Sequence, residues 1–120
     1  ETRDGTGVRD YIDIMDLIDG HISALNFLNS PKMNVISKSS EEIENYQSFN
    51  LGTGHGYSVL ELINAFEEVS GIKIPYEFES NRPGDIAECY AKNDKANNLL
   101  NWNSKRSLHD MCMTSWKFIS

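Results

Sequence analysis

The sequence predicts a mixed α/β fold in which three or four helices accompany a few short strands. Three observations support this fold class. Residues 14–28 carry apolar side chains at helical spacing, residues 47–71 are typical of a strand, a glycine-rich turn and a second helix, and the C-terminal residues form another amphipathic helix. The predicted strands are few and short, so we expect them to need another sheet to complete them.

The composition excludes several classes of protein. A chain of 120 residues, 39% hydrophobic and 24% charged, suits one globular domain with a modest core. The net charge of −7 argues against nucleic acid as a partner, because proteins that bind it usually carry a basic surface. No apolar run approaches the roughly 20 residues that cross a membrane. Two cysteines without metal-ligand spacing indicate reduced thiols in the cytoplasm and no metal site.

The first helix is predicted over residues 14–28, with Asp13 as its N-cap and Pro31 just past its end. One apolar stripe follows the helix, and we expect it to be buried: Ile14, Leu17, Ile18, Ile22, Leu25 and Leu28. His21 lies on this stripe and is expected to be a core imidazole. The polar segment 30–46 that follows lacks periodicity and predicts a solvated loop insertion.

A short strand over 47–51 is expected to enter a turn with glycines at positions 52, 54 and 56. The spacing is G-x-G-x-G and not the G-x-G-x-x-G of a dinucleotide-binding turn, so we interpret it as a tight strand-to-helix turn. Ser58 and Glu61 form a capping box for the next helix, which Gly71 ends. Its predicted apolar face consists of Val59, Leu62, Ile63, Phe66 and Val69.

The C-terminal part begins with another predicted strand, over residues 74–78. Asn93 and Ser107 are expected to cap two closing helices. The last helix is amphipathic through Leu108, Met111, Cys112, Trp116 and Ile119. Trp102 and Trp116 are predicted to anchor the core.

Residues 81–90 place two candidate site residues in one loop. Arg82 offers a planar charged fork suited to a phosphate, and Asp85 is an acceptor for the hydroxyls of a ribose. Together they indicate one wall of a nucleotide-sugar site. An Arg82–Asp85 ion pair that stiffens a surface turn is the alternative.

Residues 4–12 contain a second arginine motif. Arg9 and Tyr11 alternate with Asp13 along a predicted strand and would share one face of it. Two arginine-bearing motifs in an acidic chain suggest a local positive hollow.

Four motifs in order resemble the C-terminal third of the UDP-glucose 4-epimerases: DGTGVRDYI, FNLGTGHGYSVLEL, RPGDIAECYA and the closing LNW…SLHDMCMTSW. The resemblance covers nearly the whole chain except 30–46. It implies the smaller, mixed C-terminal substrate-binding domain of an extended short-chain dehydrogenase/reductase. Asp13 departs from the histidine usual after Tyr-Ile in that family, which affects local packing and not function.

The resemblance also implies roles for six residues, matched by position. Arg9 and Arg82 would hold a diphosphate, Asp85 would accept from the uridine ribose, Tyr11 and Val59 would line the nucleotide pocket, and Cys89 would limit the sugar pocket. A cysteine in place of a bulky tyrosine would admit N-acetylated sugars. The alternative for Cys89 is a small buried thiol.

The family's catalytic machinery is missing from the sequence. In that family NAD⁺ accepts a hydride and a Tyr-x-x-x-Lys pair removes a proton, but no tyrosine here precedes a lysine at that spacing. The resemblance therefore implies that residues 1–120 are the UDP-sugar-binding portion of a UDP-glucose 4-epimerase and are inactive alone. NAD would be bound, and a homodimer formed, by an N-terminal Rossmann domain absent from this chain. The alternatives are another nucleotide-sugar dehydratase or epimerase of the same family, and a non-catalytic nucleotide-sugar binding module.

Overall fold

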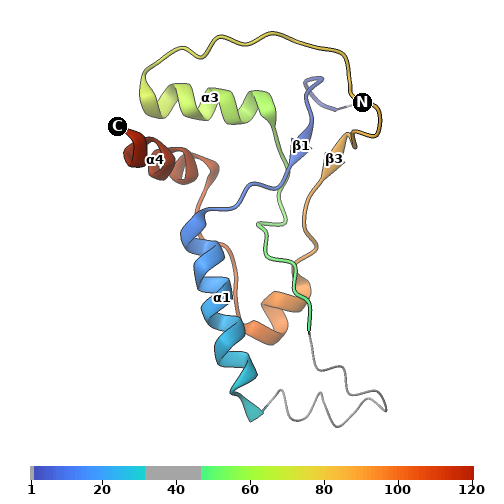
Figure 1. Ribbon diagram of the computed structural model, residues 1–120, viewed down its shortest axis with the longest axis vertical. Helices are drawn as coiled ribbons and strands as arrows, with labels where there is room; N and C mark the ends of the chain where they lie inside the picture. The colour runs from blue at the N-terminus through green and yellow to red at the C-terminus, as the bar shows by residue number, and fades with distance from the viewer. Residues whose placement is uncertain (1, 32–46) are drawn as a thin grey trace.

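The computed structural model describes residues 2–31 and 47–120. Their elements follow in the order β1 (Val8–Arg9), α1 (Ile14–Leu28), β2 (Tyr57–Ser58), α3 (Val59–Ser70), β3 (Glu88–Cys89), the π-helical turn η1 (Ala96–Leu100) and α4 (Leu108–Ile119) (Figure 1). The predicted mixed α/β class is confirmed. Residues 32–46 of the predicted loop insertion lie outside the described residues.

The three short strands form a sheet in the order β2-β1-β3. β1 pairs antiparallel with β2 and parallel with β3, and Arg9 is the partner of both Tyr57 and Cys89. β1 ends at Arg9, and Asp13 already caps α1 by accepting a hydrogen bond from the Met15 amide (2.8 Å). The prediction that Arg9, Tyr11 and Asp13 share a strand face is therefore wrong, because the chain leaves the sheet between them.

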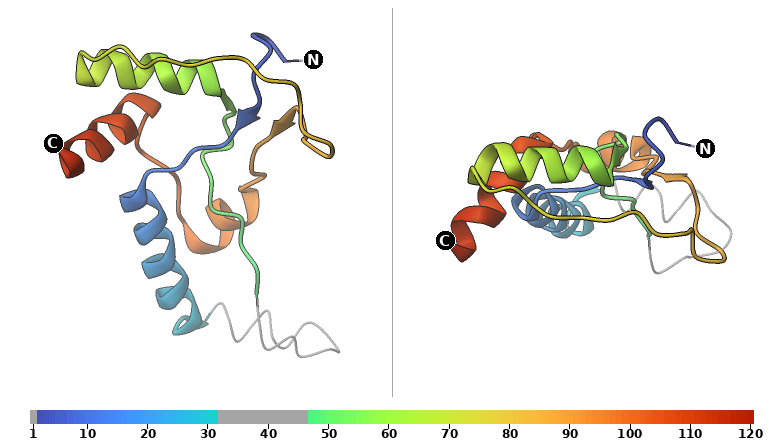
Figure 2. Two further views of the ribbon diagram at one scale, coloured as in Figure 1. Left: turned by 45° about the horizontal axis from the view of Figure 1, so that its top comes forward. Right: turned by 90° about the horizontal axis from the view of Figure 1, so that it is seen from above.

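α3 and α4 pack against each other through part of the apolar faces that the sequence predicts (Figure 2). Val59 and Ile119, which were expected on these faces, are exposed. Leu108, Met111 and Cys112 of α4 are buried against Leu62, Phe66 and Val69 of α3 and against Tyr11. Burial raises the pKa of the Cys112 thiol.

The ends of these two helices are also as predicted. Capping boxes join Ser58 to Glu61 and Ser107 to Asp110. Gly71 ends α3 with a φ of 70°, which a residue with a Cβ rarely adopts.

A second cluster lies between α1 and η1. It contains Phe27, Ala96, Leu100 and Trp102, with Leu51 against it. The Trp102 indole Nε1 donates to the Asp16 carbonyl (2.9 Å), which confirms this tryptophan as a core anchor. Trp116 is only partly buried and lies outside both clusters, so its prediction as an anchor is wrong.

The predicted burial of the α1 stripe is wrong for this chain. Its five exposed members retain between 42% and 61% of their surface: Ile14, Ile18, Ile22, Leu25 and Leu28. His21 is exposed too, and its Nδ1 lies 2.8 Å from the Leu17 carbonyl. The opposite face of α1 is buried instead, through Asp16, Gly20 and Phe27.

Asp16 explains this orientation of α1. Its Oδ2 accepts from the amides of Lys105 and Arg106 (both 2.9 Å), and its Oδ1 accepts from Arg106 Nη1 (2.6 Å). Arg106 Nε also lies 3.5 Å from Asp13 Oδ1. A Cβ on Gly20 would stand 2.7 Å from Leu51 Cδ1, so the helix approaches the 47–51 segment closely at this glycine.

The two other predicted strands are wrong. Residues 47–51 and 74–78 are extended or irregular and pair with no strand among the described residues. Tyr76 and Phe78 are exposed and contact each other edge to face. Asn93 accepts the Asn97 amide (3.0 Å) through its backbone, but its side chain donates to the Gly52 carbonyl (3.0 Å) and does not cap a helix.

The molecule is flat and open, with extents of 55 × 35 × 19 Å (Figure 2). Its Cα radius of gyration is 18.2 Å. A compact domain of 100 residues has a radius of about 13 Å. Many large apolar side chains of the described residues are accordingly exposed. Among the residues that the structure describes, no helix is long and apolar enough to cross a membrane.

Candidate functional site

Arg9 lies between two hollows in the surface. The first, of about 220 Å³, is lined by Arg9, Asp85 and residues of the 2–7 loop. The second, of about 540 Å³, is lined by Arg9, Asp10, residues 49–51 and residues 89–92, including Cys89. Two further hollows, beside α3 and between α1 and α4, contain none of the predicted site residues. Three of the six predicted residues thus surround two adjoining hollows.

The sheet fixes Arg9 relative to Cys89. The two residues are paired in parallel strands, so their side chains emerge on the same face. Arg9 Nη1 donates to the Val8 carbonyl (2.8 Å) and is 3.5 Å from that of Ala87. Cys89 is exposed, which contradicts the alternative of a buried thiol.

Arg82 and Asp85 close a tight turn, in which Asp85 lines the first hollow and Arg82 does not. Gly84 has a φ of 88°, and the Asp85 amide donates to the Arg82 carbonyl (3.1 Å). Arg82 Nε lies 3.1 Å from Asp85 Oδ2, so the two side chains form the ion pair that the sequence offered as the alternative interpretation. The Arg82 side chain is 85% exposed, which leaves its guanidinium free to move toward an anion.

Tyr11 and Val59 line neither hollow. Tyr11 packs on the α3–α4 cluster. Val59 is exposed at the start of α3, where its amide donates to the Gly7 carbonyl (3.2 Å). Both residues flank the sheet.

Asp10 is a central residue that the sequence reasoning missed. Its Oδ1 accepts from the Thr53 amide (2.9 Å) and hydroxyl (2.6 Å), and its Oδ2 accepts from the amides of Gly54 (3.0 Å) and Ala91 (3.1 Å). Burial raises the pKa of Asp10, but these hydrogen bonds outweigh it and leave the pKa below its ordinary value. The one sequence feature that could have pointed to Asp10 is its position directly after Arg9.

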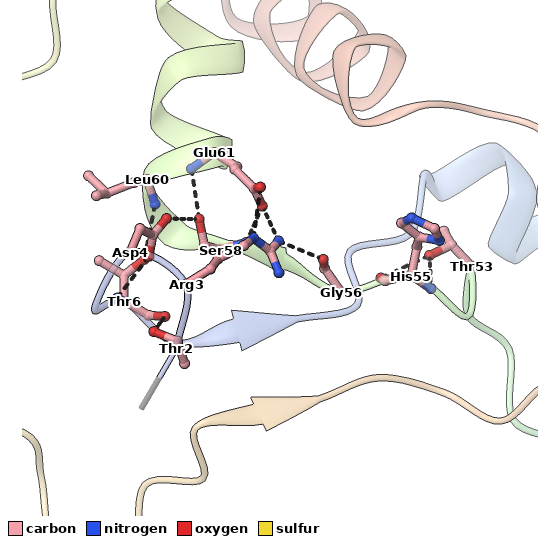
Figure 3. Close-up of polar contacts among 10 residues, drawn as sticks. All are labelled: Thr2, Arg3, Asp4, Thr6, Thr53, His55, Gly56, Ser58, Leu60 and Glu61. Atoms are coloured by element: carbon pink, nitrogen blue, oxygen red, sulfur yellow. Dashed lines mark hydrogen bonds and ion pairs between the residues drawn. The ribbon is translucent and has the colours of Figure 1, made fainter.

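A second polar network joins the 2–7 loop to the start of α3 (Figure 3). Asp4 accepts from the Ser58 hydroxyl and from the Thr6 amide (2.9 Å), and Arg3 pairs with Glu61 and donates to the Gly56 carbonyl (2.9 Å). The Ser58 and Thr6 hydrogen bonds lower the pKa of Asp4, and Arg3 lowers that of Glu61. The network holds the outer wall of the first hollow against α3.

The glycine turn does not fit a dinucleotide. In a phosphate-binding turn, backbone amides face the ligand, but here the Thr53 and Gly54 amides bond to the Asp10 carboxylate. The prediction of a tight turn agrees with this arrangement. The described ranges also contain no group of three or more His, Cys, Asp or Glu side chains placed to hold a metal.

Comparison with known proteins finds a family model and relatives that match nearly the whole chain. A family model described as GDP-mannose 4,6 dehydratase matches residues 1–115. A UDP-glucose 4-epimerase of Bacillus subtilis is 48% identical over 99% of this chain and 32% of its own length.

Two solved structures of UDP-glucose 4-epimerases are similar to this chain in sequence and in fold. The UDP-glucose 4-epimerase of Stenotrophomonas maltophila, with NAD and formylated UDP-arabinopyranose, is 41% identical with a TM-score of 0.82 over 98% of this chain and 31% of that one. The enzyme of Bifidobacterium longum, with NAD⁺ and UDP, is 42% identical with a TM-score of 0.76 over 100% of this chain and 32% of that one. This chain therefore spans about a third of the length of the proteins it matches.

These relatives confirm the resemblance that the four sequence motifs predict. The family model covers nearly the whole chain. The chain belongs to the GDP-mannose 4,6-dehydratase family of extended short-chain dehydrogenases/reductases, and its relatives there are UDP-glucose 4-epimerases.

Proposed function

We propose that the whole protein is a UDP-glucose 4-epimerase and that this chain supplies most of its UDP-sugar site. The observation that carries the proposal is the position of Arg9 between two hollows, with Asp85 in one and Cys89 in the other. A UDP-sugar has its diphosphate between its ribose and its hexose. A ligand whose diphosphate lies at Arg9 would place the ribose toward Asp85 and the hexose toward Cys89.

The charges suit this orientation. Arg9 is a permanent cation that can hold a diphosphate with paired hydrogen bonds. Arg82, which is exposed in the adjoining turn, would exchange its ion pair with Asp85 for the ligand's phosphates. Asp85 would then be released to accept the ribose hydroxyls. Tyr11 and Val59, beside the sheet, would complete the nucleotide side once the remainder of the protein is in place.

We propose that residues 1–120 form the substrate-binding portion and that an N-terminal dinucleotide-binding domain holds the NAD. The exposed stripe of α1 supports this division, since relatives are about three times as long and none of the described residues covers the stripe. The sheet or helices of the N-terminal domain would pack against this stripe. The NAD supplies the hydride acceptor, while the residues of this chain bind and orient the UDP-sugar. A cytoplasmic homodimer formed through that domain is part of the proposal.

Cys89 would set the choice of sugar. Its small exposed thiol leaves the second hollow wide, so the whole enzyme is expected to accept UDP-N-acetylhexosamines as well as UDP-hexoses. Cys89→Tyr should fill that space and sharply reduce turnover of the N-acetylated substrate, while UDP-galactose turnover largely survives. The measurement is the ratio of kcat/KM for the two substrates. An unchanged ratio would place the determinant of specificity elsewhere.

The proposal as a whole is tested in the full-length protein supplied with UDP-galactose. Formation of UDP-glucose is expected, whereas a product that has lost water would favour the dehydratase alternative. Arg82→Ala should weaken UDP binding by about 1.5–3 kcal/mol, the usual contribution of hydrogen bonds to a charged group, and Arg82→Lys should restore little because an ammonium lacks the guanidinium fork. Lys117→Ala, which removes one exposed positive charge from α4, is the matched control. Equal binding by Arg82→Lys and the unaltered protein would make Arg82 a turn residue only.

A further inference from the structure

Two separate segments form the walls of the second hollow, the one that contains Cys89. Residues 49–51 form one wall and residues 89–92 the other. No β-ladder joins them, because residues 47–51 belong to no strand and β3 ends at Cys89. Their separation must therefore be set by side chains. Asn50 Nδ2 donates to the Lys92 carbonyl (3.2 Å) directly between the walls, and Asp10 adds four hydrogen bonds beside it.

Asp10 joins the two segments at the base of this hollow. One carboxylate oxygen bonds to Thr53, just past the first wall, and the other bridges the Gly54 and Ala91 amides. The chain is packed tightly at this point, since a Cβ on Gly52 would stand 2.5 Å from Ala91 Cβ and 2.6 Å from Asp10 Oδ2. A lateral displacement of either wall would break at least one of these hydrogen bonds.

We propose that Asp10 is a positioning residue that sets the width of the second hollow and so the affinity for the sugar moiety of the ligand. The inference rests on the proposed UDP-sugar function. Asp10 acts through the walls that it holds, and Arg9 next to it binds the diphosphate. The affinity for UDP alone therefore depends less on Asp10 than the affinity for UDP-glucose does.

Only a carboxylate satisfies the four donors around this position. Both oxygens accept two hydrogen bonds each. An asparagine would turn its amide NH₂ toward donors on one side or the other, and the pair facing it would lose its acceptor. Asp10→Asn thus changes few atoms and removes two of the four hydrogen bonds.

The experiment is titration calorimetry on the full-length protein with UDP and with UDP-glucose. Asp10→Asn should bind UDP-glucose about tenfold more weakly and UDP within about twofold of normal. Asp16→Asn is the matched control, since Asp16 also accepts two backbone amides on one oxygen but lies away from both hollows. It should lower the melting temperature and leave the ratio of the two affinities unchanged.

Equal weakening of UDP and UDP-glucose by Asp10→Asn would overturn the inference, and so would unchanged binding of both. A protein without substitutions that binds neither ligand would overturn the proposed function itself. If Asp10→Asn fails to fold, Thr53→Val removes the hydroxyl bond to Oδ1 and leaves the three backbone bonds. Thr53→Val should lower the ratio of the affinity for UDP-glucose to the affinity for UDP by about two- to threefold. An unchanged ratio in Thr53→Val would then overturn the inference.

Discussion

α3 and α4 bury part of each other's apolar faces, whereas α1 leaves six large apolar side chains exposed and buries the opposite face through Asp16, Gly20 and Phe27. All three helices have an apolar stripe and a capping side chain. The difference is that α3 and α4 contact each other, while none of the described residues covers the α1 stripe. An amphipathic pattern therefore identifies a helix and its apolar side, but does not show that the side is buried within this chain.

Lowering the pH should produce the largest difference in stability between the α1 contacts and the α3–α4 contact. The pKa of Asp16 in α1 is lowered at a side chain that is 1% exposed, and the pKa of Asp10 is lowered as well. The lowered pKa values in α3 and α4 are those of Glu61, Glu67 and Asp110, which are more exposed than Asp16 and lie outside the apolar contact between the two helices. Groups with lowered pKa values stabilise the fold above their unfolded pKa of about 4, and this stabilisation is lost as the pH falls through the lower folded values. Hydrogen exchange between pH 5 and pH 2 should therefore show the contacts of Asp10 and Asp16 opening before the apolar α3–α4 contact. Simultaneous opening of both regions would contradict the comparison.

Met111→Ala should destabilise the 120-residue chain by about 2–3 kcal/mol, because it leaves a cavity in the α3–α4 contact. Met111 is only 8% exposed. Urea unfolding measures the change. Phe118→Ala, on the same helix but 91% exposed, is the control and should alter stability by less than about 0.5 kcal/mol. Similar costs for both variants would mean that α4 is not packed through Met111.

Leu25→Ser should have the smallest effect in the 120-residue chain, within about 0.5 kcal/mol, because the side chain is already 61% exposed. In the full-length protein the same change should cost at least about 1 kcal/mol if the stripe packs against the N-terminal domain. Urea unfolding of both proteins gives the comparison. Equal small costs in both would show that the stripe stays uncovered.

The local parts of the fold were predictable because their causes lie close in the sequence. The capping box of Ser58 and Glu61, the left-handed Gly71 and the N-cap Asp13 each depend on residues within a few positions. The strands predicted over 47–51 and 74–78 failed because a strand needs a partner, and none of the described residues supplies one.

The candidate site was predicted in part. The motif resemblance selected Arg9, Asp85 and Cys89, which line the two hollows. It did not indicate Asp10, whose importance depends on amides that are 43 and 81 positions away.

The helices, their caps, the tight glycine turn and the family could be inferred from residue order alone, since each of these depends on local chemistry or on motifs in order. Which face of α1 is buried became clear only from the three-dimensional contacts of the helix. The hydrogen bonds from the Thr53 and Gly54 amides to Asp10 and the position of Arg9 between two hollows also became clear only from the three-dimensional structure. The reason is that burial and carboxylate coordination depend on which distant segments meet, and apolar periodicity carries no information about the identity of the partner.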